Sequence, residues 1–260
     1  MTVMTEKTRT VLTEKTRTVP LGRLTLVELR KLADTRAGFW LLLVIGLATA
    51  ATSGILLGWA PDSEQTFSSF FTFGMLPSAV LLPVLGILSV TSEWSQRTAL
   101  TTFTLVPARS RVMVAKLAAG TLIAIAATVA AGLLAAVANV IAGSLGGDAS
   151  WSLDPSLIWQ SLLLQVIFVL MGISFGALLL NTPVAIVVYF ALPTVWSVLG
   201  GIITKLQEAG QWLDLNVTSQ ALSEPDATGG EYARLAVSVG VWVVLPLVVG
   251  FVRVLRREVS

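Results

Sequence analysis

Side chains that could take part in recognition or chemistry gather between residues 92 and 116. The segment holds an acidic–aromatic pair, several threonines and a run of basic residues: Glu93, Trp94, Arg97, Thr98, Pro107, Arg109, Arg111 and Lys116. Glu93 and Arg97 are four residues apart, so on a helix they share one face and can pair with each other or with a partner. A charged, partly apolar segment of this kind suits docking to a soluble protein. An ordinary basic topology anchor is the alternative, and the residues alone leave both open.

Several kinds of chemistry are excluded by composition. The chain contains no His and no Cys, so it lacks an imidazole base, a thiolate nucleophile and the usual ligands of zinc and haem. It also lacks a GxxxxGK[ST] phosphate loop, and the apolar segments contain no ionisable residue of the kind that ion-driven carriers use. We therefore expect no catalytic, cofactor-binding or metal-binding residue on this chain, and no nucleic-acid partner.

Long charge-free segments dominate the chain. Only 12% of its residues are charged, against roughly a quarter in soluble domains. A helix that rises 1.5 Å per residue needs about 20 residues to cross a ~30 Å hydrocarbon core. Residues 155–204 form a charge-free run of double length, which we expect Asn181, Thr182 and Pro183 to divide by a tight turn. The pattern predicts an all-α polytopic membrane protein with spans near 38–59, 68–91, 117–143, 157–180, 184–203 and 234–253.

The basic residues divide unequally between the two sides that these spans define. Fifteen of the 17 lie before the first span, in the 92–116 loop or after the last span, and only Lys205 and Arg234 lie on the opposite side. Loops rich in Lys and Arg stay in the cytoplasm. We therefore expect both termini to be cytoplasmic. The composition, rich in Ala, Val, Leu and Thr, suggests a bacterial source, so the expected location is the inner or plasma membrane of a bacterial cell.

Two segments precede the first span. Residues 1–19 are polar and Thr-rich, with an octapeptide repeated in tandem, and are predicted to be a disordered tail. Residues 20–35 begin at Pro20 and place several leucines on one face, which predicts an interfacial amphipathic helix. The pattern has one irregularity, because Glu28 falls inside the apolar arc. We expect residues 20–260 to form a single transmembrane domain.

Residues 204–233, before the last span, are too long for a simple turn. Apolar residues around Trp212 predict a short amphipathic helix there, with Gly210 as its expected break. A loop containing Pro225 is expected to follow.

The 92–116 segment resembles the matching loop of the ABC-2 type permease family, the membrane subunits of ABC exporters. The matching features are Glu93-Trp94, Thr98, Thr101-Thr102, Pro107, Arg109, Arg111 and Lys116. Members usually carry Gly before the first Thr, where this chain has Arg97. The likeness extends to the helix with Glu28-Leu29-Arg30-Lys31 before the first span, the six spans and the tight turn between the fourth and fifth.

The resemblance implies a function that composition alone does not show. The 92–116 segment would contain a cytoplasmic coupling helix that sits against an ABC ATPase, and ATP and Mg²⁺ would bind to that partner subunit. Two permease subunits, identical or related, would form the translocation path among membrane lipids. The cargo would be a lipophilic or amphipathic molecule, such as a drug, antibiotic, lipid or peptide. A non-transport scaffold or sensor that anchors a cytoplasmic partner is the alternative function.

The orientation can be tested directly, because the chain has no Cys that would react. We expect Ser63→Cys, Ser150→Cys and Ser223→Cys to react with an impermeant thiol reagent added outside intact cells. The variants Ser95→Cys, Ser110→Cys and Ser260→Cys should react only after the membrane is opened. Labelling of Ser110→Cys from outside would contradict the orientation.

Overall fold

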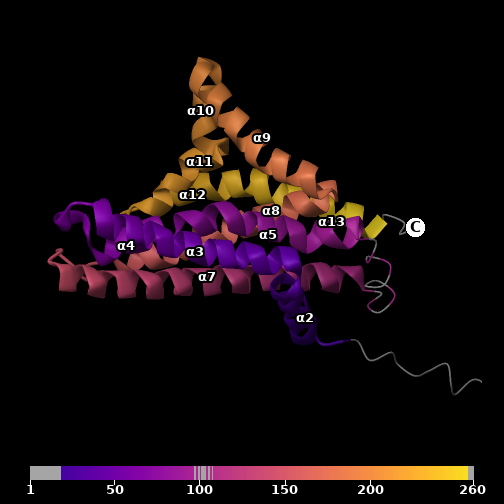
Figure 1. Ribbon diagram of the computed structural model, residues 1–260. Coiled ribbons are helices and arrows are strands. Elements are labelled where there is room, and N and C mark those ends of the chain that lie inside the picture. Colours follow the sequence, from indigo (N-terminus) through magenta and orange to yellow (C-terminus); the bar gives the residue numbers. More distant parts are fainter. Residues whose placement is uncertain are drawn as a thin grey trace, which may run out of the picture.

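The computed structural model describes residues 19–96, 98, 100, 104, 106 and 108–256, and the regular structure of these residues is entirely helical. Six helical segments are long and apolar enough to cross a membrane, and they correspond one to one to the predicted spans: Arg36–Trp59, Phe67–Ser95, Arg109–Leu145, Pro155–Leu179, Thr182–Ile202 and Gly229–Arg256. The chain is thus a multi-pass helical membrane protein (Figure 1). The predicted tail 1–19 lies outside the described residues except for Val19.

The amphipathic helix before the first span is confirmed as α2, Leu21–Asp34. Figure 1 shows it projecting from the bundle at a steep angle to α3 and α7. The chain then turns at Thr35, whose side chain accepts a hydrogen bond from the Gly38 amide and caps α3, Arg36–Trp59. A Cβ at Gly38 would lie 1.8 Å from the Leu32 carbonyl oxygen, so the sharp α2–α3 corner requires glycine there.

The helix α8, Pro155–Leu179, lies at the centre of the bundle and contacts α5 (Leu76–Ser95), α7 (Arg109–Leu145) and α13 (Leu245–Arg256). Small residues let the backbones approach closely. A Cβ at Gly172 would lie 2.2 Å from the Pro83 carbonyl oxygen of α5, and one at Gly250 would lie 2.7 Å from the Leu178 amide. A Cβ at Gly120 of α7 would likewise meet the Ile173 side chain at 2.7 Å. Gly120 of the third span therefore packs within this chain.

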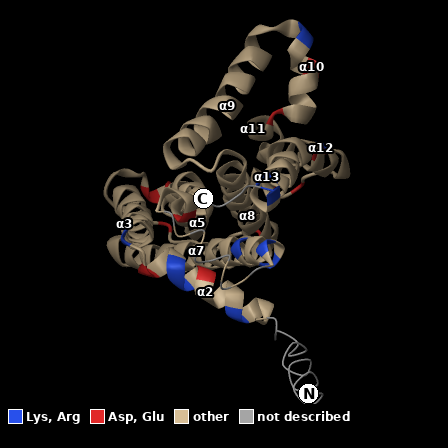
Figure 2. Ribbon diagram, turned by 90° about the vertical axis from the view of Figure 1, so that its right-hand side faces the viewer, with Lys and Arg blue, Asp and Glu red and all other residues tan. Residues whose placement is uncertain are grey.

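The two ends of the bundle differ in charge. At one end, here called the basic end, α7 begins with Arg109 and Arg111, and the last turn of α13 contains Arg253 and Arg256. Figure 2 looks onto this end, where α2 also lies. At the other end, two connections are joined by backbone hydrogen bonds: residues 60–66, which contain the short helix η1 (Asp62–Glu64), and residues 146–154. Their donors and acceptors are Phe67 N to Ser150 O, Asp148 N to Asp62 O, and Ala149 N to Gln65 O. The helix α4, Phe67–Gly74, follows the first connection and packs on α7.

The helix α9, Thr182–Ile202, leans away from the bundle in both views (Figures 1 and 2). It begins at the predicted turn, where the Asn181 side chain accepts a hydrogen bond from the Val184 amide. Only 11% of its most apolar window is buried within the chain, against 56% for α8, and Ala185 and Tyr189 are its buried residues. Most of this helix therefore presents apolar side chains outward.

The segment before the last span contains three short helices: α10 (Thr204–Leu213), α11 (Leu215–Thr218) and η2 (Ser219–Ser223). The expected break at Gly210 is wrong, because α10 continues to Leu213. Asp214 separates α10 from α11. Its carboxylate accepts a hydrogen bond from the Asn216 amide and so caps the start of α11. The last span follows as α12 (Gly229–Val239), a π-helical turn η3 (Gly240–Val244) and α13.

The close approach of α8 to α5 makes Gly172 intolerant of a side chain. Because the contacted atom is backbone, Gly172→Ala should destabilise the bundle by about 1–3 kcal/mol, which lowers the melting temperature by roughly 2–12 °C. Thermal unfolding in detergent measures this. The matched control is Gly54→Ala, where an added Cβ meets no atom within 4 Å and no loss is expected. Equal melting temperatures for the two variants would contradict the close packing.

Candidate functional site

Four charged side chains from three helices form a closed ring of ion pairs at the basic end. Glu28 and Lys31 come from α2, Glu93 from the last turn of α5, and Lys116 from the third turn of α7. The Lys31 ammonium lies 2.9 Å from Glu28 and 2.8 Å from Glu93, and the Lys116 ammonium lies 2.7 Å from Glu28 and 3.0 Å from Glu93. Charges alternate around this ring, which we call the charge ring, and its net charge is zero.

Lys116 is the most deeply buried member, with a side chain only 3% exposed. An ammonium group has three protons to donate. Lys116 donates to Glu28 and Glu93 and, at 2.6 Å, to the Ser89 backbone carbonyl, so all three protons have acceptors. This full set of partners offsets the several kcal/mol that burying an ammonium costs.

Lys31 has the same two carboxylate partners, but its side chain is more exposed to solvent, at 39%. Burial opposes its charge, but the hydrogen bonds and negative charges of Glu93 and Glu28 outweigh it and raise the pKa of Lys31 above its ordinary value. A raised lysine pKa means that its stabilising contribution is present below pH ~10.5 and is lost only as the pH rises through the folded-state pKa. Lys31 is therefore charged at neutral pH.

Helical spacing on α2 directs Glu28 into the bundle. Leu24, Glu28 and Leu32 follow each other at four-residue intervals and are the buried residues of the helix. The irregular position of Glu28 in the apolar arc was thus the signal for a buried ionic site. Sequence reasoning found this irregularity but did not connect it with Lys116, because the two residues are 88 positions apart.

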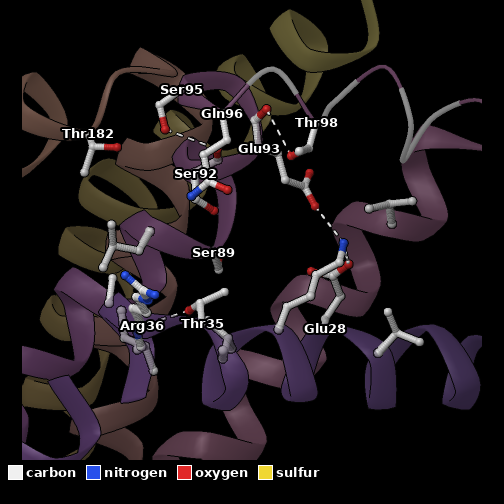
Figure 3. Close-up of a pocket in the computed structure, with 18 of the residues that line it drawn as sticks. Glu28, Thr35, Arg36, Ser89, Ser92, Glu93, Ser95, Gln96, Thr98 and Thr182 are labelled. Carbon is white, nitrogen blue, oxygen red and sulfur yellow. Dashed lines mark hydrogen bonds and ion pairs between the residues drawn. The ribbon is translucent and has the colours of Figure 1, made fainter. Parts of the chain in front are cut away.

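A cavity of about 840 Å³ adjoins the ring between α2, the start of α3 and the end of α5. Figure 3 shows Glu28 and Glu93 on one side of it, with Ser92, Ser95, Gln96 and Thr182 around the remainder. Leucines and valines of α2, α5 and α7 also line it, and the Arg36 side chain lies at its edge. The cavity combines apolar walls with hydroxyl groups and fixed charges, a lining suited to amphipathic groups.

The remaining expected site residues that the structure describes do not join the ring. Trp94 packs partly buried on the core beside it, and the Thr98 amide donates to the Glu93 carbonyl at 2.9 Å. Arg109 donates to the Val254 and Leu255 carbonyls at the end of α13, and Arg111 donates to the Val19 carbonyl at 2.7 Å. These two arginines hold the end of α13 and Val19 against the start of α7. Arg97, Pro107 and most of the expected coupling helix lie outside the described residues.

Compared with models of known protein families and with curated proteins, the chain matches neither a family model nor a curated sequence.

The ring predicts an unequal response to loss of its two lysines. Lys116→Met leaves two buried carboxylates with one partly exposed lysine, and should destabilise the protein by about 3–5 kcal/mol. Lys31→Met, at the wetter position, should cost at most about 1 kcal/mol. Thermal unfolding of both variants in detergent provides the comparison.

A double variant tests whether charge balance is the cause. Glu28→Gln combined with Lys116→Met leaves the neutral pair of Lys31 and Glu93. It should recover part of the stability lost in Lys116→Met alone, with a coupling free energy of about 0.5–3 kcal/mol. Strictly additive losses would show that the four groups act independently.

Proposed function

We propose that this chain is the permease subunit of an ATP-driven exporter of the ABC-2 type, and that a separate ATPase docks at its basic end. The observation that carries the proposal is the charge ring, which joins α2 to both helices that flank the 96–108 segment. Glu93 lies just before that segment and Lys116 shortly after it. A displacement of this segment would therefore be transmitted through the ring to α2, α5 and α7 together.

The distribution of charge supports the direction of this coupling. The basic end faces the cytoplasm under the positive-inside rule, which is where a soluble ATPase would meet it. The chain has no phosphate loop of its own, and the middle parts of its spans carry no ionisable group to couple to an ion gradient. The energy for transport would therefore come from ATP and Mg²⁺ bound to the partner.

The outward apolar faces support assembly with a second permease subunit. The helix α9 presents Val187, Val195 and Val198 away from its own bundle, each more than half exposed. A second copy or a related chain would cover part of this face, and lipid would cover the remainder. The translocation path would then run between two subunits for a lipophilic or amphipathic cargo, exported from a bacterial cell.

The first expectation is biochemical. Affinity-tagged protein should co-purify with a soluble ATPase and the complex should hydrolyse ATP, whereas the isolated chain should show no saturable nucleotide binding. Nucleotide binding by the isolated chain would contradict the proposal. Co-purification with a cytoplasmic protein that lacks ATPase activity would instead favour the anchoring function.

The coupling role is tested by a charge-only change within the ring. In Glu93→Gln, Lys116 keeps one carboxylate partner, and we expect transport per hydrolysed ATP to fall about tenfold or more, the effect of losing ~1.4 kcal/mol of coupling. Asp34→Asn is the control, since Asp34 is an exposed carboxylate at the end of α2 and takes no part in the ring. Both variants are compared at equal amounts of inserted complex. Wild-type transport in Glu93→Gln and in Arg97→Ala would defeat the coupling assignment.

A further inference from the structure

A second cavity lies on the other side of α2 from the ring cavity, in a groove between α3, α5 and α7. It encloses about 390 Å³ and is lined by residues 42–49 of α3, by Ser78 and Leu82 of α5, and by residues 123–134 of α7. The residues Leu29 and Ala33 of α2 close one end. The lining contains no charged side chain.

The two polar groups that line the groove already have partners. The Thr49 hydroxyl donates to the Gly74 carbonyl at 3.2 Å, and the Ser78 hydroxyl donates to the Met75 carbonyl at 2.8 Å while accepting from the Gln165 amide. A buried water needs two to four polar partners, and apolar cavities stay dry. The groove therefore offers water little and favours a hydrocarbon occupant.

The protein's own side chains leave this space open. The α7 wall is largely alanine, at Ala126, Ala127, Ala130 and Ala131. On the facing helix, a Cβ added at Gly46 would meet no atom within 4 Å. Unfilled apolar walls forfeit dispersion contacts that any fitting hydrocarbon would restore.

Shape decides between a lipid chain and a protein helix as the occupant. Residues 123–134 extend along α7 for about 16 Å at 1.5 Å per residue. A helix of that length and 10 Å diameter fills roughly 1,200 Å³, far more than the groove holds. A cavity of ~150 Å³ accepts benzene, which has six carbon atoms. Scaled by volume, the groove of about 390 Å³ accommodates a chain of about 15 carbon atoms.

The α2 end of the groove supplies a charge for a headgroup. Arg30 is exposed and lies about 60° from Ala33 around α2, at 100° per residue. Leu26, exposed on the same outer face, suits the boundary between headgroups and hydrocarbon. An arginine guanidinium at that boundary matches the phosphate of a phospholipid.

We propose that this groove binds one acyl chain of a membrane phospholipid, with the lipid phosphate at Arg30. The site holds a structural lipid along α3 and α7, separate from the ring cavity. It does not depend on the transport function proposed above.

Phosphatidylglycerol with a photoreactive diazirine on its acyl chain tests the site in vesicles containing the full-length protein. Illumination should label residues 42–49 and 123–134 in preference to the lipid-facing surface of α9. Gly46→Leu places a side chain in the groove and should reduce labelling of residues 123–134 about tenfold, since several excluded methylenes exceed the ~1.4 kcal/mol of a tenfold change. Arg30→Gln should weaken labelling of both segments.

The matched control is Gly54→Leu, also on α3 and equally free of neighbours within 4 Å, but outside the groove. Labelling of residues 123–134 in Gly54→Leu should equal that in the wild type. Gly46→Leu should also keep the melting temperature of delipidated protein at or above the wild-type value, because it fills a void. Equal labelling of Gly46→Leu and wild type, uniform labelling of all lipid-facing helices, or crosslinks to a second protein chain in place of lipid would each overturn the proposal.

Discussion

The buried ammonium of Lys116 is the constraint on which the basic end depends. A lysine in this position must have a negative partner from elsewhere, and Glu28 and Glu93 supply it from two different helices. Each carboxylate in turn contacts Lys31, so none of the four charges can move without unbalancing another. The position of α2 is thus fixed by charge as well as by Leu24 and Leu32.

Elsewhere the helices are held together by close van der Waals packing, because in lipid the hydrophobic effect contributes little to helix association. Gly172 against Pro83 and Gly250 against Leu178 bring α5 and α13 onto α8 until backbone atoms touch. The peripheral helices α3 and α9 lack this closeness and are mostly exposed. The central helices are therefore in backbone contact, whereas α3 is anchored by the side chains of Ile45, Thr49 and Ser53 along its length.

The architecture was predictable from the sequence because charges interrupt the apolar runs at the right intervals. The turn at Asn181 was predicted from local residue types. It is confirmed, because the Asn181 side chain accepts a hydrogen bond from the Val184 amide and caps α9. The ring was not predictable, since pairing Glu28 with Lys116 requires knowing that α2 folds back across α7. Local spacing instead suggested Arg97 as the partner of Glu93, whereas in the described residues Glu93 contacts two lysines. Arg109 and Arg111, which the resemblance assigns to docking, also donate to backbone carbonyls within the chain, and local spacing gives no sign of these contacts.

The hydrogen bonds between residues 60–66 and 146–154 also limit how this protein can move. They tie the turn of the α3–α5 hairpin to the turn of the α7–α8 hairpin through backbone atoms, which side-chain substitutions do not remove. Gly172 holds α8 against α5 farther along the bundle, and the charge ring joins α5 to α7 at the opposite end. Relative movement of the two hairpins is therefore restrained at both ends of the bundle and between them. Proline in place of Phe67, Asp148 or Ala149 would remove one of these amide donors, whereas any other substitution keeps all three.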